Sequence, residues 1–176
     1  MPLPLSLPPT FASRLRASSR GLIGMWVSSG SPLVAEICAG SGLDWLLVDG
    51  EHSPLSLESI QLQLQAVAAY PITPVVRVPA NDPVLIKQYL DLGAQNLLVP
   101  MVNSAEEAAA AVAATRYPPE GVRGVGSALA RAARWNRVDS YLARSNAEHV
   151  SLICQIETSA AVESAEEIAA VEGVDA

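Results

Sequence analysis

Short apolar runs alternate along this chain with segments of helical spacing, and this alternation is the feature that most restricts the fold. The strand-like runs cover residues 22–27, 45–48, 74–78, 96–100 and 150–156. Runs this short and uniformly apolar are typical of strands buried on both faces of a parallel sheet, with crossover helices between them. The sequence therefore predicts an α/β fold built from repeated βα units.

The residues that begin and end the intervening segments support this repeat. Ser31 and Asp82 are suitable N-cap residues, and each precedes a proline suited to the first helical position. Gly40 and Gly93 lie just past the expected helix ends. The remaining helices are predicted by apolar spacing or by a Ser-x-x-Glu capping box, over residues 57–67, from Ser104, and over 159–171.

These units are too few for a closed barrel. Five complete βα repeats are present, and Gly173–Ala176 has the character of a sixth strand beginning. A TIM (β/α)8 barrel needs eight units and typically about 250 residues. The 176 residues therefore predict a TIM barrel truncated to about five βα units plus the start of a sixth strand. Residues 1–12 are predicted to be a flexible, proline-rich tail, and residues 13–176 the partial barrel domain.

The composition excludes several classes of protein. The net charge of -7 argues against generic nucleic-acid binding, and no apolar run approaches the roughly 18 residues of a membrane helix. Cys38 and Cys154 lie in apolar surroundings without a secretory signal, which indicates reduced core cysteines and a cytoplasmic protein. A small-molecule partner is expected, with neither nucleic acid nor membrane.

Residues 118–148 break the βα rhythm and form a long, glycine- and arginine-rich connection. Arg123 lies among glycines that permit close backbone approach, so it is able to meet a carboxylate. The alternative is a solvated helix whose arginines face water or a neighbouring subunit, at positions Arg131, Arg134, Arg137 and Arg144. The sequence leaves both interpretations open.

Charged residues follow three of the predicted strands. Asp49, Glu51 and His52 come after the second, Arg77 lies in the third, and Glu157 follows the fifth. Each alone is consistent with a solvated turn or a structural ion pair, but together they favour one polar site at the carboxyl ends of the strands.

The residue types at this predicted site suggest a reaction class. A histidine with a pKa of roughly 6.5 exchanges protons near neutral pH, and an arginine offers a fork of donors to a carboxylate or an enolate. Glu157 suits a divalent metal ion, with Asp49 or Glu51 available to hold metal-bound water. A metal-held 2-oxo acid is the natural ligand. The one lysine, Lys87, falls within a helix, which disfavours Schiff-base catalysis.

Several motifs in order resemble the HpcH/HpaI aldolase family. They are Asp49-Gly50-Glu51-His52, Val75-Val76-Arg77, Asn81-Asp82-Pro83, Leu98-Val99-Pro100-Met101-Val102, the segment 117–124 and Gln155-Ile156-Glu157-Thr158. The resemblance implies a TIM-barrel, class II pyruvate aldolase that requires Mg²⁺, Mn²⁺ or Co²⁺. It also implies cleavage of 4-hydroxy-2-oxo acids to pyruvate and an aldehyde, a place in the catabolism of aromatic compounds, and assembly as a hexamer.

The same resemblance assigns roles to five residues. It implies that His52 is the catalytic acid/base, that Arg77 binds substrate and stabilises the pyruvate enolate, and that Gln155 contacts substrate. Glu157 is implied as a metal ligand. Asp91 is implied to tune the basicity of the histidine, although its place near a helix end predicts the opposite rim of the barrel.

Two alternatives to an active aldolase remain at this point. The family's second metal carboxylate, an aspartate shortly after the sixth strand, lies beyond residue 176, so a truncated, catalytically inactive paralogue or fragment serving as an interaction domain is the main alternative. A lyase acting on a coenzyme A thioester shares the expected fold and metal. The match around Arg77 and Tyr117 favours the aldolase.

Overall fold

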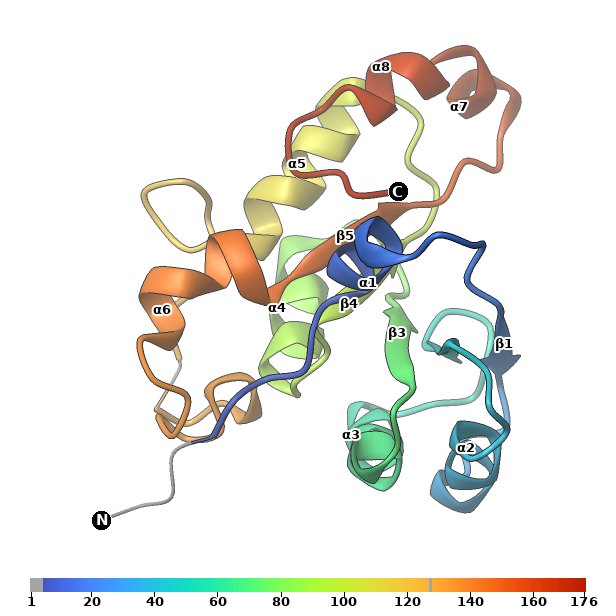
Figure 1. The fold of residues 1–176 in the computed structure, drawn as a ribbon. Helices are drawn as coiled ribbons and strands as arrows, with labels where there is room; N and C mark the ends of the chain where they lie inside the picture. Colours follow the sequence, from blue (N-terminus) through green and yellow to red (C-terminus); the bar gives the residue numbers. More distant parts are fainter. Residues whose placement is uncertain (1–4, 127) are drawn as a thin grey trace.

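A computed structural model describes residues 5–126 and 128–176 and contains one five-stranded parallel sheet in the order β1-β2-β3-β4-β5 (Figure 1). The strands are β1 (Gly24–Val27), β2 (Trp45–Asp49), β3 (Thr73–Arg77), β4 (Asn96–Val99) and β5 (Ser151–Cys154). All five predicted strands are confirmed, the last being shorter than expected. Their sequential, all-parallel order is that of the first units of a TIM-barrel type of fold.

Helices follow each strand. The elements are α1 (Phe11–Ala17), α2 (Pro32–Ala39), α3 (Leu57–Ala66), η1 (Val67–Ala69), α4 (Pro83–Asp91), α5 (Ala105–Thr115), η2 (Arg131–Ala133), α6 (Tyr141–Arg144), η3 (Ser145–His149), α7 (Ser159–Glu163) and α8 (Ala165–Ala169). None of the helices in the described residues is long and apolar enough to cross a membrane.

The predicted caps are present. The Asp82 carboxylate accepts hydrogen bonds from the amides of Val84 and Leu85 at 2.8 and 2.9 Å, and Pro83 takes the first helical position of α4. Gly93 follows the end of α4 with φ +97°, a conformation that favours glycine. These residues fix where α4 begins and ends, and therefore where the chain re-enters the sheet.

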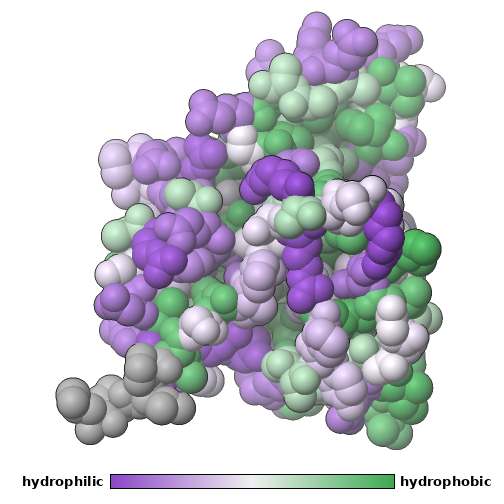
Figure 2. All heavy atoms as spheres, in the orientation of Figure 1, coloured by the Kyte–Doolittle hydropathy of each residue, from purple (hydrophilic) through white to green (hydrophobic). Residues whose placement is uncertain are grey.

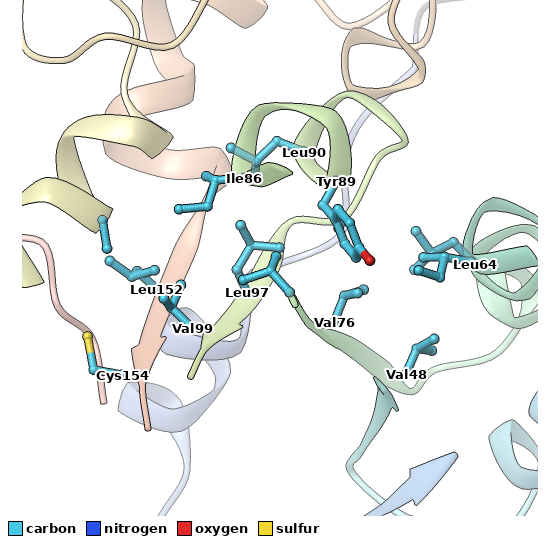
Figure 3. Close-up of a cluster of buried hydrophobic side chains, with 14 of the residues drawn as sticks. Val48, Leu64, Val76, Ile86, Tyr89, Leu90, Leu97, Val99, Leu152 and Cys154 are labelled. Atoms are coloured by element: carbon cyan, nitrogen blue, oxygen red, sulfur yellow. The ribbon is translucent and has the colours of Figure 1, made fainter. Parts of the chain in front are cut away.

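The main core lies between the sheet and the helices that cover one of its faces. Figure 3 shows strand side chains such as Val48, Val76 and Leu97 directed toward Leu64 of α3 and Ile86 of α4. Alternate residues of the same strands, Leu47, Val75 and Leu98, form a smaller cluster on the other face. Both faces of the sheet are therefore apolar, as the uniform runs predicted.

Part of the apolar surface remains exposed. Leu33 and Ile37 of α2 are 65% and 67% exposed. Figure 2 shows hydrophobic residues gathered at the lower right of this view, over α2, whereas polar residues cover much of the rest. Helix α2 therefore carries apolar side chains on its solvent-exposed side as well as on the side that packs against the core.

The end of the described chain differs from the sequence prediction. The helix expected over 159–171 is divided into α7 and α8 at Ser164, whose ψ of 7° is not helical. Residues 173–176 form no strand, but the Asp175 amide donates to the Leu152 carbonyl and the Cys154 amide donates to the Ala176 carbonyl, both at 2.9 Å. These last residues thus lie beside β5, where a sixth strand would begin.

The N-terminal segment also differs from the predicted tail. Residues 1–4 lie outside the described residues, but the Leu5 amide donates to the Arg137 carbonyl at 3.0 Å. Thr10 caps α1, so the predicted boundary at residue 12 falls inside a helix. Phe11 packs edge-on against Trp45 at 6.1 Å between ring centroids, which ties α1 to the sheet.

Candidate active site

Asp49 and Arg77 are neighbours at the carboxyl edge of the sheet, the edge where the parallel strands end. The two residues are paired in register between β2 and β3. Arg77 Nε donates to Asp49 Oδ1 and Arg77 Nη2 donates to Asp49 Oδ2, both at 2.9 Å, and both side chains are buried. This bidentate geometry fixes the guanidinium plane more firmly than a single ion pair would.

The same carboxylate shapes the turn that follows β2. Asp49 Oδ1 accepts hydrogen bonds from the amides of Glu51 and His52, at 3.0 and 3.3 Å. A Cβ atom at Gly50 would lie 2.6 Å from both the Arg77 carbonyl oxygen and the Tyr89 hydroxyl, so the turn requires glycine there. The Asp-Gly-Glu-His motif is therefore a structural unit that presents Glu51 and His52 at the edge.

Arg77 makes three further contacts. Its Nη1 lies 2.8 Å from Glu51 Oε2 and 3.4 Å from Gln155 Oε1. The guanidinium carbon lies 4.5 Å from the centre of the Trp26 ring, which comes from the end of β1. Sequence reasoning missed Trp26, although an aromatic residue at the end of a predicted strand was a usable signal.

The surroundings keep both members of the buried pair charged. Burial acts to raise the pKa of Asp49, but hydrogen bonds from Arg77 and from the Glu51 and His52 amides outweigh it, so the pKa lies below its ordinary value. Burial likewise acts to lower the pKa of Arg77, and the Asp49 and Glu51 charges outweigh it and raise the pKa. Arg77 therefore keeps its positive charge, and Asp49 its negative charge, near neutral pH.

His52 lies at the open side of this network. Its side chain is 75% exposed, and its Nε2 lies 3.8 Å from Glu51 Oε2. The imidazole is thus free to meet a ligand.

Glu157 and Gln155 extend the network from the loop after β5. Gln155 Nε2 donates to Glu157 Oε2 at 3.1 Å, and the Met101 amide donates to Glu157 Oε1 at 2.8 Å. Met101 has a φ of 56°, an uncommon conformation for a side chain of this size, and was missed by the sequence analysis. The loop after β4 therefore helps to orient the Glu157 carboxylate.

The described residues supply only part of a metal site. Within residues 5–126 and 128–176, no group of three or more His, Cys, Asp or Glu side chains is arranged to hold a metal ion. Both oxygens of Asp49 bond to Arg77, whereas Glu157 is exposed at the edge and retains free lone pairs. The Glu157 carboxylate is of the oxygen-ligand type that a hard divalent cation prefers.

Asp91 does not join this network. It is the last residue of α4, and its Oδ1 accepts a 2.8 Å hydrogen bond from Nη2 of the fully buried Arg123. Among the described residues, His52 and Asp91 share no hydrogen bond or ion pair. Since α4 runs back toward the start of the strands, Asp91 lies near the other edge of the sheet, as its place in the sequence predicted. Arg123 does meet a carboxylate, but that of Asp91.

Comparisons with known proteins identify the family of the chain. Residues 22–176 match the family described as HpcH/HpaI aldolase/citrate lyase. The chain is 58% identical, over 99% of its own length, to hydroxypyruvate/pyruvate aldolase of Deinococcus radiodurans. It is 54% identical, over 94% of its length, to 4-hydroxy-2-oxo-heptane-1,7-dioate aldolase of Escherichia coli. It spans 64% and 63% of the lengths of these two relatives.

A solved structure of the same family also has the fold of this chain. The crystal structure of an HpcH/HpaI aldolase/citrate lyase family protein from Burkholderia cenocepacia superposes with a TM-score of 0.88 at 43% sequence identity. The match covers 93% of this chain and 65% of that one. The family model, the sequence identities and the fold therefore agree, and the chain belongs to the HpcH/HpaI aldolase/citrate lyase family.

Proposed function

We propose that this protein acts as a metal-dependent aldolase that cleaves 4-hydroxy-2-oxo acids into pyruvate and an aldehyde. The observation that carries the proposal is the guanidinium of Arg77, which Asp49 and Glu51 hold at the carboxyl edge beside Gln155. The names of the two curated relatives support the substrate class.

Arg77 has the role of stabilising negative charge. Cleavage of the C3–C4 bond leaves an electron pair that becomes an enolate, with its charge on the 2-oxo oxygen. A guanidinium held by four residues before the reaction begins loses little energy to reorganisation as that charge develops. Nη1, which faces Glu51 and Gln155, is the donor we assign to the substrate, and Gln155 is assigned as a second substrate contact.

His52 has the role of moving protons. The exposed imidazole would take the proton of the 4-hydroxyl group as the C3–C4 bond breaks, which releases the aldehyde. A proton returned to C3 of the enolate then gives pyruvate, so the proton count balances. Glu51, 3.8 Å away, would stabilise the imidazolium between these two transfers.

A divalent ion belongs to the proposal because members of this family generally depend on one. When bound, Mg²⁺, Mn²⁺ or Co²⁺ would polarise the 2-oxo group. Glu157 is the residue of this chain that we assign as a ligand, oriented by Gln155 and the Met101 amide. Asp49 uses both oxygens on Arg77, so its assigned role is to orient that arginine rather than metal-bound water.

The direct test is pyruvate release from a 4-hydroxy-2-oxo acid by the purified protein, with a chelator and after each metal is restored. His52→Gln and Arg77→Lys should each lower kcat by about 10²-fold or more. Arg144→Lys, which alters an exposed arginine paired with Glu148, is the matched control and should leave turnover unchanged. Normal turnover in His52→Gln would contradict the assigned base.

The implied role of Asp91 needs a separate test, because its contact in the structure is with Arg123. If Asp91 tunes His52, Asp91→Asn should displace the pH profile of kcat. If Asp91 only compensates the charge of Arg123, the profile stays in place and the thermal midpoint falls.

Assembly as a homo-hexamer and a cytoplasmic location are part of the same proposal. Sedimentation velocity of the purified protein measures the first, and fractionation of the source cells measures the second.

A further inference from the structure

A second concentration of arginines lies at the amino edge of the sheet, where the strands begin. A cavity of about 270 Å³ opens there between the end of α3, the residues that enter β3 and β4, and the N-terminal segment. Its lining includes Ile72 and Pro74 at the start of β3 and Gln95 just before β4. This cavity is therefore on the opposite edge from Asp49 and Arg77.

The cavity is lined by three arginines and no acidic residue. Arg14, Arg131 and Arg134 come from three separate segments, and no Asp or Glu is among the lining residues. In the part of the chain that the structure describes, none of the three has a carboxylate within ion-pairing distance. Such a concentration of positive charge is unusual in a protein of net charge -7.

Backbone carbonyls orient two of these side chains. Arg131 Nη1 donates to the Leu92 carbonyl at 3.0 Å, at the end of α4, and Arg134 Nη1 donates to the Arg131 carbonyl at 2.5 Å. A Cβ atom on Gly93 would lie 2.5 Å from Arg131 Nη1 and 3.1 Å from Arg134 Nη1, so both guanidinium groups converge over this glycine. Two cations that meet in this way repel each other unless an anion lies between them or nearby.

The pKa values of Arg131 and Arg134 are both lower than that of an ordinary arginine. Burial, with a contribution from the charge of Arg134, lowers the pKa of Arg131 to about 10, and burial also lowers the pKa of Arg134. Both groups still carry a proton at neutral pH. Of the two interpretations that the sequence left open, a fully solvated helix does not describe Arg131 and Arg134, which are half-buried against the domain itself.

The backbone around the pair is strained. Arg134, Trp135 and Asn136 have φ values of 49°, 55° and 61°, three consecutive residues in the left-handed region. Residues other than glycine adopt this conformation at a cost of about 1–2 kcal/mol each. Strain of this kind is concentrated at binding sites, where it holds a side chain in a position it would not otherwise take.

We propose that the cavity at the amino edge binds a small anion bearing a phosphate or carboxylate group, held by Arg14, Arg131 and Arg134. Guanidinium groups suit both anions because their donors match two oxygens at once. The volume lies just below the range that holds drug-sized ligands, which indicates a small metabolite or an inorganic ion. The site is independent of the proposed aldolase reaction, since it shares no residue with the carboxyl edge.

The test is calorimetric titration of the purified protein with inorganic phosphate and, separately, with succinate, against chloride at equal ionic strength. Saturable binding of either anion is expected, and the anion bound more tightly identifies the chemical group. Arg134→Gln and Arg14→Gln should each weaken binding about tenfold or more, the loss expected for one charge-assisted hydrogen bond. Arg134→Lys keeps the charge and should lose less affinity than Arg134→Gln.

The matched control is Arg137→Gln, an exposed arginine of the same loop that does not line the cavity. It should leave the affinity within about twofold. Because Arg134→Gln risks a folding defect, its thermal midpoint is measured without anion, and Arg14→Gln, whose one hydrogen bond is to the Pro71 carbonyl, provides the second variant.

Two results would overturn the proposal. The first is a failure of the binding assay in either of two forms. Phosphate and succinate bind no more strongly than chloride, or they bind to Arg134→Gln and Arg14→Gln as strongly as to the wild type, which would place the anion elsewhere. The second is a self-association of the protein that Arg134→Glu abolishes and phosphate does not affect, which would assign the cavity to an acidic group of a second copy.

Discussion

The two edges of the sheet hold arginines in opposite electrostatic settings, buried at the carboxyl edge and half-buried at the amino edge. At the carboxyl edge, Arg77 is bonded to Asp49 and Glu51, so its charge is balanced and its position fixed. At the amino edge, Arg131 and Arg134 have carbonyl partners and, among the residues that the structure describes, no carboxylate partner. The carboxylates around Arg77 hold its guanidinium rigidly in the position we propose for acting on a substrate. Arg131 and Arg134 lack such partners among the described residues, so their positive charge is available to attract an anionic ligand. The following predictions test this contrast.

The largest effect is expected for Arg77→Met. The substitution leaves the buried Asp49 carboxylate and the partly buried Glu51 carboxylate without their cation, and breaking a buried pair typically destabilises a protein by about 3–5 kcal/mol. Urea unfolding followed by circular dichroism measures the loss. A loss below about 1 kcal/mol would mean that this pair behaves like an exposed one, and the proposed rigidity of the site would fail.

A second effect is the acid sensitivity of the same pair. Because the pKa of Asp49 is lower in the folded protein than its ordinary value, the pair stabilises the fold above the unfolded-state pKa, about 3.9. That stability is lost as the pH falls through the lower, folded pKa. The difference in unfolding free energy between the wild type and Asp49→Asn should therefore be constant from pH 6 to 8 and should shrink in acid. If the difference in unfolding free energy between the two proteins is the same at the lowest pH that permits folding as at pH 7, the lowered pKa assigned to Asp49 is wrong.

A smaller effect is expected at the amino edge, for Arg131→Met. The substitution removes the hydrogen bonds from Arg131 to the Leu92 and Leu64 carbonyls, at 3.0 and 3.5 Å, and this loss is partly offset by relief of the repulsion with Arg134. We expect about 1–2 kcal/mol in urea unfolding without added anion. A loss equal to that of Arg77→Met would remove the contrast between the edges.

The smallest effect is expected for Trp26→Leu, which removes the ring stacked on Arg77. Cation–π contacts at partly exposed sites contribute about 0.5–1 kcal/mol. The control is Trp135→Leu, because Arg137 lies 6.0 Å from that ring and is exposed. Equal losses in both variants would show that Trp26 contributes only buried area and does not position Arg77.

Much of the fold follows from local chemistry that the sequence displays. The five strands, the caps at Ser31 and Asp82, and the turn at Gly93 were predictable because each depends on residues close together in the chain. The location of Asp49, Glu51, His52 and Arg77 at one edge was predictable as well, since parallel strands place their ends together. The roles of these residues came from resemblance to a family.

Other features depended on contacts between distant residues, and only the tertiary structure decided them. The pairing of Asp91 with Arg123 and the bond from Arg131 to the carbonyl at the end of α4 join residues 32 and 39 positions apart. No spacing rule predicts which carboxylate or carbonyl an arginine will reach across that distance. The sequence by itself determined the elements and the edge at which the acidic residues gather. The tertiary structure decided which charges are balanced, because balance depends on which groups folding brings within a few ångströms.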